Sequence, residues 1–509
     1  MLPKKEEPAK KQVFLLLFGI VVLGFFLRFY GLTKQSLWHD EFASWSLSNY
    51  DNMSEVLVHI RYDLHPPGYQ IMLYFVEKYL GDSEWLLRFP SALGGGLAIL
   101  AMYWLGTRLY SYREGLFAAA FTAVLWSPVY YSQEARAYSL LLLFSVLPAC
   151  FWISILEGLS DKIRLSPQVI FGYIATAVVC CYLHYFGLYL IFLQGLVTAI
   201  YFILKPRKWL HILGIYTAIV AAFLPCFIIM LDKFMHATSW IPAPKDFGST
   251  IIQYFGFLYN NPSGYFPNKN SKEVCLFVVL MYAFLLIYSL YCAVKSRKYK
   301  DMFISKGMLL VLWLIVPFIT VYIKSRVSTP ILTYRNLIIS LPAAYLLLSR
   351  SIARIPIRFR YHAALLLIIS ALLVSHLVFC LDFYSMPHKQ QFREAVEFIV
   401  KQDPSHKNSL IISCGLDKFF DYYFEKFGSD RRVDVIGQKK EDIPEIVKTI
   451  RAEKPQYIWY IRAHKIPDRQ FLLFLDKNLT CIDYKNFLGA DVWLFRLQKT
   501  GTPSLKRDS

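Results

Sequence analysis

The chain has 509 residues, of which 56% are hydrophobic, 17% aromatic and only 18% charged. Soluble globular domains average about half apolar and about a quarter charged residues, so this composition excludes an ordinary soluble protein and predicts a polytopic membrane protein. The formal net charge is +19. The lysines and arginines gather in short loops between apolar runs, which is a signal of membrane topology and does not indicate nucleic-acid binding.

The first predicted element is an apolar run over 13–33, preceded by a lysine-rich tail, 1–12. About 20 apolar residues cross a bilayer core, so the run is long enough for one membrane span. No small-residue cleavage site follows it, and we therefore predict an uncleaved anchor with the tail in the cytoplasm.

The loop after this span, 34–83, is about fifty residues long, a length that usually signals function in a compact protein. Its apolar spacing predicts short helices lying on the membrane surface over 41–50, 51–63 and 69–80. A Pro-Pro-Gly sequence precedes the third helix, which puts proline at its usual first-turn position.

Five polar residues of this loop are candidates for chemistry: Asp40, Glu41, Tyr62, Asp63 and His65. On their own they have ordinary structural interpretations. An Asp-Glu pair is typical of a helix cap, and a histidine before two prolines is typical of a turn that precedes a helix.

Further apolar runs of membrane-spanning length bring the predicted total to about eleven spans. They lie at 84–108, 114–131, 137–157, 168–183, 186–204, 209–231, 274–294, 306–324, 335–350 and 360–381. His184 and Tyr185 divide one overlong run, which favours two helices joined by a tight outer turn. Within the second run, Gly94-Gly95-Gly96 indicates close helix packing, since no strand precedes it and no lysine follows it as in a phosphate loop.

The positive charges set the predicted orientation, because lysine and arginine favour cytoplasmic loops. They fall in every second loop, which places the amino terminus inside and the carboxyl-terminal region outside. The residues concerned are Arg108, Arg113, Lys162, Arg164, Lys205, Arg207, Lys208, Lys295, Arg297, Lys298, Lys300, Arg350, Arg354, Arg358 and Arg360.

Charged residues also occur at the predicted outer ends of later spans. Glu134 and Arg136 precede the 137–157 span, in the sequence Ser-Gln-Glu-Ala-Arg, where a serine cap with a glutamate in the first turn is the structural alternative. Arg326, together with Lys324, ends the 306–324 span, where snorkelling of long side chains to the interface is an alternative. Arg335 begins an apolar helix, where an unpaired charge is expensive.

The region 382–498 is more polar and predicts a small α/β domain on the outer side, followed by a tail, 499–509. Helical spacing covers 391–401 and 442–452, and short strand-like runs lie at 410–413, 457–461 and 492–497. Cys414 and Cys481 belong to this domain. They could form a disulfide in an oxidising compartment, or both could be free.

The combination of motifs resembles a known family. The Asp40-Glu41 pair after the first span, the Asp-Leu-His-Pro-Pro-Gly sequence at 63–68 and the Ser-Gln-Glu-Ala-Arg-Ala-Tyr sequence at 132–138 are similar to motifs of the GT-C glycosyltransferases. Within these, the chain looks like the protein O-mannosyltransferase and aminoarabinose (lipid A) transferase group, especially bacterial glycosyltransferase-39-type members. The resemblance covers 13–381, with weaker similarity at 183–187 and 334–337.

The resemblance implies a GT-C fold of about eleven transmembrane helices, juxtamembrane helices in the first outer loop and an extracytoplasmic α/β domain. It implies a polyprenyl-phosphate sugar donor and an active site at the outer face. Asp40 would be the catalytic base and Glu134 a second acidic residue, with the role of Glu41 open. A leaving phosphate needs positive charge, and arginine grips phosphate with a planar fork. The residues expected at the donor phosphate are His65, Arg136, Arg326 and Arg335, and those expected to shape the substrate pocket are Tyr62, Asp63, Tyr138, His184 and Tyr185.

Two points of the resemblance stay open. Aminoarabinose transferases carry a lysine where this chain has His65, whose charge at neutral pH depends on its surroundings. More distant relatives bind a divalent metal, and Asp40, Glu41 and Glu134 could hold magnesium or manganese through oxygen ligands. The closer group works without metal, so no cofactor is assigned.

These features lead to the expectation of a glycosyltransferase, with its amino terminus in the cytoplasm, in the inner (plasma) membrane. It would transfer a sugar from a polyprenyl phosphate to a lipid or glycan such as lipid A, lipopolysaccharide or another envelope polymer, as a monomer surrounded by membrane lipids. The alternatives are a protein O-mannosyltransferase, a polymerase or ligase that uses diphosphate-linked donors, and a transporter or flippase. Transporters commonly show internal repeats with broken midplane helices, and no such repeat is seen.

Overall fold

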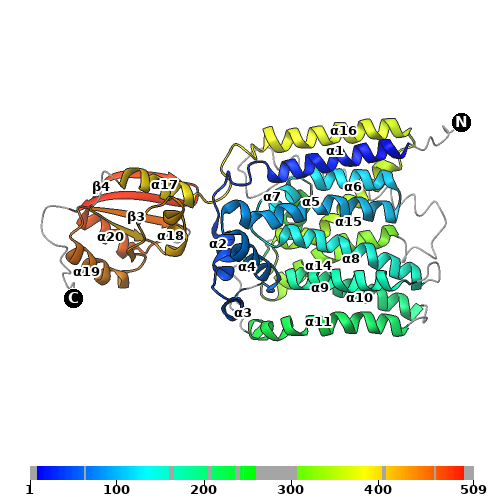
Figure 1. The fold of residues 1–509 in the computed structure, drawn as a ribbon, viewed down its shortest axis with the longest axis horizontal. Coiled ribbons are helices and arrows are strands. Elements are labelled where there is room, and N and C mark those ends of the chain that lie inside the picture. Colours follow the sequence, from blue (N-terminus) through cyan, green and yellow to red (C-terminus); the bar gives the residue numbers. More distant parts are fainter. Residues whose placement is uncertain are drawn as a thin grey trace. The chain divides into compact units, whose positions relative to one another are not determined.

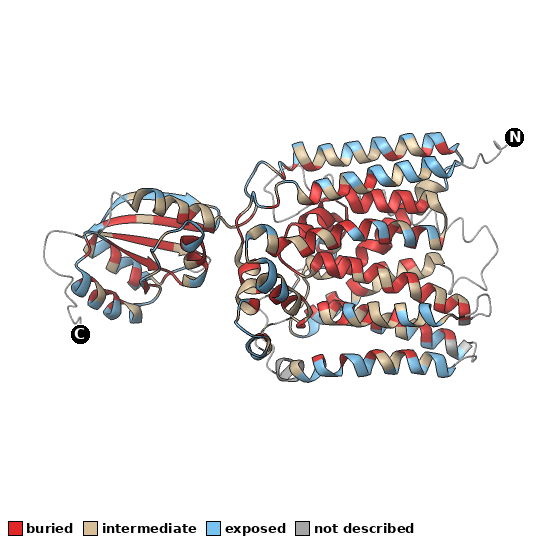
Figure 2. Ribbon diagram, viewed as in Figure 1, coloured by how far each residue is buried: buried red, intermediate tan, exposed pale blue. Residues whose placement is uncertain are grey.

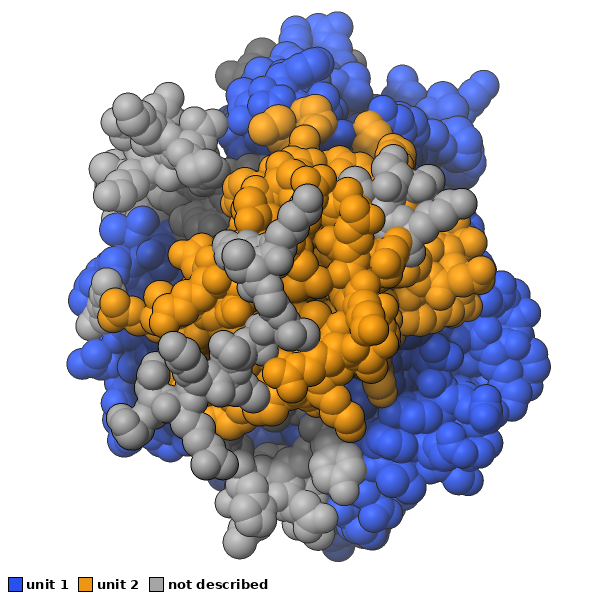
Figure 3. Space-filling view, turned by 90° about the vertical axis from the view of Figure 1, so that its left-hand side faces the viewer, with its two compact units in different colours: residues 1–32, 44–384 blue, residues 33–43, 385–509 orange. Residues whose placement is uncertain are grey.

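The structure is a computed structural model. It describes residues 9–61, 63, 65–159, 165–204, 209–235, 241–244, 246–259, 306–403, 408–463 and 466–497. The chain divides into two compact units, which are coloured separately in Figure 3. Unit 1 comprises Met1–Leu32 and Ser44–Tyr384, and unit 2 comprises Thr33–Ala43 and Ser385–Ser509.

Unit 1 is a bundle of long helices that run side by side, with short helices at one end (Figure 1). Its long elements are α1 (Lys10–Phe29), α5 (Glu84–Leu109), α6 (Tyr112–Val124), α8 (Tyr138–Leu159), α9 (Pro167–Leu183), α10 (Tyr185–Leu204), α11 (Trp209–Met235), α14 (Lys306–Val327), α15 (Leu341–Ala353) and α16 (Phe359–Ser375). The shorter ones are α3 (Met53–Ile60), α4 (Gly68–Leu80), α7 (Trp126–Ser132), α12 (Phe247–Leu258), the 3-10 helix η2 (Tyr334–Ser340) and the π-helical turn η3 (His376–Cys380). Helix α2 (His39–Ser48) begins in unit 2 and continues into unit 1.

The burial pattern of unit 1 is that of a membrane protein. In the described part of the chain, seven helical segments are long and apolar enough to cross a bilayer. The core lies along α5, α6, α8 and α15, whereas α1, α11 and α16 expose apolar side chains on their outer sides (Figure 2). Phe14 of α1 and Val220 of α11 are about two-thirds exposed, at 65% and 66%. Such exposure is unfavourable in water and suits contact with lipid, and the predicted polytopic helical fold is confirmed.

Most of the predicted spans correspond to single helices, but two do not. The predicted span 114–131 is wrong as a single helix, because α6 ends at Val124 and α7 starts at Trp126. Proline at 128 cannot donate to the carbonyl four residues earlier, that of Val124, and its ring clashes there. The predicted span 335–350 begins as the 3-10 helix η2 and becomes α-helical only at Leu341. The predicted span 274–294 lies outside the described residues.

Side chains of other segments bond the backbone carbonyls that the break between α6 and α7 leaves without helical donors. Arg28 of α1 is fully buried and donates to the carbonyls of Thr122 and Ala123 at 2.7 and 3.0 Å. Gln133, just after α7, donates in return to the carbonyls of Leu27, Arg28 and Tyr30 at the end of α1, at 2.9–3.2 Å. Unpaired backbone groups are costly in hydrocarbon, so the two side chains fasten the broken helix to α1.

The glycine triplet of α5 lies where neighbouring helices come closest, and the predicted packing role is confirmed. A Cβ atom on Gly94 would lie 2.6 Å from Leu140 of α8, and one on Gly96 would lie 2.5 Å from the ring of Phe25 on α1. A Cβ on Gly95 would overlap the hydroxyl of Ser132 and lie 2.7 Å from that of Ser139. Only glycine lets α1, α7 and α8 approach α5 in this way.

Unit 2 contains a five-stranded mixed sheet in the order β2-β1-β3-β5-β4. Strand β1 pairs in parallel with β2 and β3, and β5 pairs antiparallel with β3 and β4. The elements are α17 (Phe392–Gln402), β1 (Ser409–Ser413), α18 (Asp417–Lys426), β2 (Val435–Ile436), α19 (Ile443–Glu453), β3 (Tyr457–Ala463), α20 (Arg469–Asn478), β4 (Leu479–Phe487) and β5 (Ala490–Leu497). The predicted small α/β domain is confirmed.

The two cysteines of unit 2 are not paired. Cys414, which is buried, follows β1, whereas Cys481, which is exposed, lies in β4, and neither is part of a disulfide. Strands β3 and β5 separate β1 from β4, which at about 4.8 Å per strand gives about 14 Å. Disulfides need Cα atoms within about 7 Å of each other, so of the two alternatives left open by the sequence the disulfide is excluded.

The glycine packing gives a stability prediction with an internal control. We expect Gly95→Ala to lower the free energy of unfolding by about 1–3 kcal/mol, because the methyl group overpacks the contact between α5 and the hydroxyl groups of Ser132 and Ser139. Gly19→Ala in α1 is the matched control, since nothing lies within 4 Å of its Cβ position. Thermal unfolding in detergent should show a loss for the first variant and a small gain for the second, from helix propensity. Equal unfolding temperatures would contradict the packing account.

Candidate functional site

The described candidate residues fall into both units. Asp40 and Glu41 belong to unit 2, and the remaining ones belong to unit 1. Tyr62 lies outside the described residues. Within unit 1 the structure brings several of the candidates to one small pocket at the turn between α9 and α10. The described residues that line it are His65, Tyr69, Gln70, Arg136, Ala137, Tyr138, Leu183 and His184.

Gly68 lets the loop reach this pocket. It is the first residue of α4, and a Cβ atom there would lie 2.6 Å from the carbonyl oxygen of Tyr182 in α9. The start of α4 therefore packs directly on the end of α9, which brings the rings of His65 and His184 to 4.9 Å between centroids. Asp63 is held nearby by a hydrogen bond from the amide of Gln70.

Two guanidinium groups contact one aromatic ring at the pocket. The Cζ atoms of Arg136 and Arg335 lie 6.0 and 5.6 Å from the centroid of the Tyr138 ring. Arg136 is nearly buried and donates to the hydroxyl of Ser44 at 2.9 Å, while its own carbonyl accepts from Ser91 at 2.9 Å. Cation–π contact and these bonds hold two positive charges close to each other, which suits an anion such as a phosphate.

His184 is a neutral hydrogen-bond donor in this pocket. Burial, and then the positive charges of Arg136 and Arg335, lower its pKa to about 3. The backbone N–H of Phe186 donates to Nδ1 at 3.1 Å, so Nδ1 carries the lone pair and the proton is on Nε2. Nε2 is buried and has no hydrogen-bond partner among the described residues.

Two more polar atoms of the pocket share this situation. The hydroxyl of Tyr138 and the side-chain carbonyl of Gln70 are buried without hydrogen-bond partners among the described residues. Leaving such a group unpaired costs about 1–3 kcal/mol, and native proteins do so rarely. Three such atoms from three different elements, beside two guanidinium groups, make this pocket a candidate site for a polar, anionic ligand.

The other candidates of unit 1 do not line the pocket. Glu134 is buried in the loop between α7 and α8, where its carbonyl accepts from the N–H of Arg136. Tyr185 begins α10. Arg326 donates to the carbonyl of Pro244 at 2.9 Å, and Lys324 donates to Ser328 at 2.9 Å, both on exposed surface at the end of α14. Gln133 and Ser44 were not predicted from the sequence, because their partners lie about ninety or more positions away.

The acidic pair in unit 2 is unequal. Both residues lie in the first turn of α2, where negative charge suits the helix dipole. Glu41 is fully buried, accepts from the N–H of Trp38 at 3.3 Å and pairs with Lys389 at 3.6 Å. The helix-cap interpretation is therefore confirmed for Glu41. Asp40 keeps 21% of its side chain exposed, with Nδ1 of His39 at 3.6 Å.

A metal site does not fit the described residues. No group of three or more histidine, cysteine, aspartate or glutamate side chains in the described ranges could hold a metal ion. Magnesium and manganese need several oxygen ligands around one point, which the described residues do not bring together.

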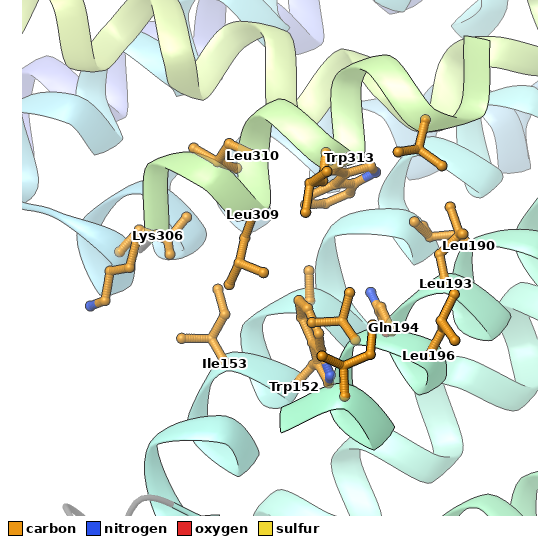
Figure 4. A pocket seen from close by; sticks show the side chains of 16 residues that line it. Trp152, Ile153, Leu190, Leu193, Gln194, Leu196, Lys306, Leu309, Leu310 and Trp313 are labelled. Carbon is orange, nitrogen blue, oxygen red and sulfur yellow. The ribbon is translucent and has the colours of Figure 1, made fainter. Parts of the chain in front are cut away.

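A second pocket lies between α8, α10 and α14 in the spanning part of unit 1 (Figure 4). Its described lining is apolar apart from Gln194 and Lys306, and Figure 4 shows Lys306 at its edge. Among the described lining residues there is no carboxylate that could act as a general base.

No protein-family model and no curated protein matches the sequence. Among solved structures, the chain is similar to apo ArnT from Cupriavidus metallidurans, with a TM-score of 0.58 and 14% identity, over 96% of this chain and 98% of that one. It is also similar to the same protein bound to undecaprenyl phosphate, with a TM-score of 0.55 and 13% identity over the same shares. The chain has the GT-C fold. The predicted fold is thereby confirmed.

Another similar structure is the Archaeoglobus fulgidus oligosaccharyltransferase in complex with Zn and sulfate, with a TM-score of 0.47 and 12% identity. It matches 87% of this GT-C chain and 67% of that one.

Helix α4 carries one carboxyl group with a strongly shifted pKa, that of Glu77. Glu77 of α4 accepts from the hydroxyl of Ser48 at the end of α2 at 2.6 Å. Burial raises its pKa to about 8, against the opposing hydrogen bond from Ser48. Glu77 therefore keeps its proton in the folded protein at pH values where an ordinary glutamate has lost it.

This shift predicts a pH dependence of stability. Between about pH 4.5 and 8 the unfolded chain has released the Glu77 proton and the folded chain has not. The free energy of unfolding should fall as pH rises through this window, by at most about 1.4 kcal/mol per pH unit. Thermal unfolding should show that the stability of Glu77→Gln relative to the wild type increases between pH 5 and pH 9. Ser48→Ala, which removes the bond that favours the ionised form, should extend the fall to higher pH. A wild type and Glu77→Gln variant with parallel pH profiles would contradict this assignment.

Proposed function

We propose that the chain is an integral membrane glycosyltransferase of the inner (plasma) membrane. It transfers one sugar from a polyprenyl-phosphate donor to a hydroxyl group of a lipid or glycan at the outer face. The observation that carries the proposal is the pocket in which Arg136 and Arg335 flank the ring of Tyr138 beside the Nε2–H of His184. The shared fold with ArnT, which has been solved with undecaprenyl phosphate, supports a polyprenyl phosphate as the donor's carrier.

The pocket chemistry suits the phosphate end of such a donor. A phosphate has oxygen acceptors and negative charge, and the pocket offers guanidinium groups and a neutral imidazole N–H. Because His184 is neutral, it adds a hydrogen bond without a third positive charge. Tyr138 and Gln70 supply a hydroxyl and an amide carbonyl, which are the groups that bind sugar hydroxyls. Asp63 and Tyr185 would complete the sugar side, and His65 remains a proposed residue of the donor phosphate site.

The proposed reaction is a single displacement. Asp40, as general base, takes the proton from the acceptor hydroxyl while its oxygen attacks the anomeric carbon. The bond between that carbon and the phosphate oxygen breaks, and the polyprenyl phosphate leaves with the electron pair. The configuration at the anomeric carbon inverts. Arg136 and Arg335 stabilise the charge that develops on the phosphate, and Glu134 remains a proposed second acidic residue near the acceptor.

The base is tested by Asp40→Asn, which keeps the size of the side chain and a good helix-capping group. We expect transfer to fall by about 100-fold to 10,000-fold, because proton removal is lost. The assay supplies membranes with polyprenyl-phosphate sugars and measures radiolabel in the lipid and glycan fractions. Binding of the donor and the unfolding temperature should stay at wild-type values. Full activity in this variant would exclude Asp40 as the base.

The role of His184 is tested by two amide variants. The amide nitrogen of glutamine can reach the position of Nε2 and donate, whereas asparagine replaces Nδ1 and only preserves the bond from Phe186. We expect His184→Asn to weaken binding of polyprenyl phosphate about 10-fold, the value of one neutral hydrogen bond, and His184→Gln to retain most of it. Fluorescence titration from pH 5 to 8 should also show the same pH dependence for the wild type and His184→Gln, because only the second ionisation of the phosphate, at about pH 6, changes charge in this range. Equal affinities for the two variants would contradict a donor role for Nε2.

A further inference from the structure

The segment that carries the acidic pair is part of the same compact unit as the C-terminal α/β fold. Thr33–Ala43 is grouped with Ser385–Ser509, although about 340 residues of sequence separate the two stretches. The amino-acid composition of Ser385–Ser509 does not explain why Thr33–Ala43 belongs to the same unit. The contacts within unit 2 show what holds the segment.

Backbone groups of the segment are bonded by side chains of the C-terminal region. Arg393 at the start of α17 donates to the carbonyls of Thr33 and Lys34 at 2.8 and 2.9 Å. The N–H of His39 donates to the side-chain carbonyl of Gln390 at 2.9 Å. These bonds fix the path of the chain into α2 and leave it little freedom.

Helix α18 contributes a further hydrogen bond and a cluster of aromatic side chains. The N–H of Leu37 donates to the hydroxyl of Tyr423 at 2.7 Å. Phe42 is fully buried and stacks on Phe419 with centroids 4.4 Å apart, and Tyr422 meets it edge-on at 5.4 Å. Stacked and edge-on rings are favourable geometries that also fix rotation about α2. The apolar face of α18 thus packs on the segment.

A buried ion pair completes the attachment. Lys389 and Glu41 have side chains only 2% and 0% exposed, with 3.6 Å between Nζ and Oε2. Glu41 also accepts from the N–H of Trp38, so the same carboxylate joins the first turn of α2 to the C-terminal region. A charge buried this deeply requires its partner, because removal of one partner leaves the other uncompensated.

We propose that the C-terminal α/β domain is a positioning device for Asp40, and that Lys389 is a positioning residue that acts through Glu41. The inference rests on the proposed function, since it assumes that Asp40 is the base. Asp40 precedes Glu41 in the same helical turn, so any loosening of Glu41, Phe42 or the N–H of His39 moves the carboxylate of Asp40. A displacement of about 1 Å at a reacting group can cost about 100-fold in rate.

The experiment compares three single substitutions in the full-length protein. Lys389→Met removes the buried partner, Lys389→Arg keeps the charge, and Lys401→Met is the matched control. Lys401 forms an ion pair with Glu397 in α17, but its side chain is 71% exposed, and surface pairs contribute little. Hydrogen exchange of residues 33–48 and steady-state transfer kinetics are measured for each.

We expect Lys389→Met to speed exchange at the N–H groups of Leu37 and His39 by at least about 10-fold and to lower kcat by about 100-fold, with the KM for donor within about threefold. Lys389→Arg should restore most of both values, and Lys401→Met should match the wild type. The double variant Glu41→Gln with Lys389→Met removes both charges and should recover much of the exchange protection if the uncompensated carboxylate is the cause.

Two results would overturn the proposal. Unchanged exchange in Lys389→Met would show that the ion pair does not hold the segment. Faster exchange with an unchanged kcat would show that the segment is held but that its position does not govern transfer. A wild-type protein that transfers no sugar from any polyprenyl phosphate is a different failure. It overturns the proposed function and the catalytic half of this inference, while the exchange rates still decide the anchoring.

Discussion

The helix break at Val124 is the constraint on which the arrangement of unit 1 depends. Proline at 128 ends α6, and the carbonyls of Thr122 and Ala123 then need donors in a region without water. Arg28 supplies them from α1, and Gln133 fastens the chain after α7 to the end of the same helix. An unbroken helix would continue through 125–137. The break turns the chain so that Arg136 and Tyr138 reach the pocket.

The electrostatics of the pocket follow from the close approach of two arginines to one aromatic ring. Arg136 and Arg335 lie against one ring, and their charges together with burial keep His184 neutral. This arrangement also favours one kind of ligand. A neutral N–H and two fixed cations bind an anion with several oxygen acceptors better than they bind an uncharged sugar. Under the proposed function, these guanidinium groups supply the positive charge that a leaving phosphate needs.

The sequence predicted the fold class because hydropathy and helix length are local properties. Family motifs in the sequence suggested His65 and Arg136 for the donor phosphate and Tyr138 and His184 for the substrate pocket, and the structure brings all four to one pocket. It missed what depends on distant contacts or on backbone detail. The split at Val124 was missed, although proline at 128 was a usable signal for it. The tautomer of His184 depends on a hydrogen bond from Phe186, and hydropathy contains no information about it.

The two acidic residues of the first loop illustrate how far a motif alone can be interpreted. Side by side in sequence, Asp40 and Glu41 have the same chemistry, and a pattern cannot separate them. Burial does, because Glu41 is enclosed with Lys389 while Asp40 stays partly exposed. A general base must reach its substrate, and a buried, ion-paired carboxylate is a poor one. Glu41 is therefore fixed by its ion pair, and this gives the adjacent Asp40, which is still accessible, a defined position.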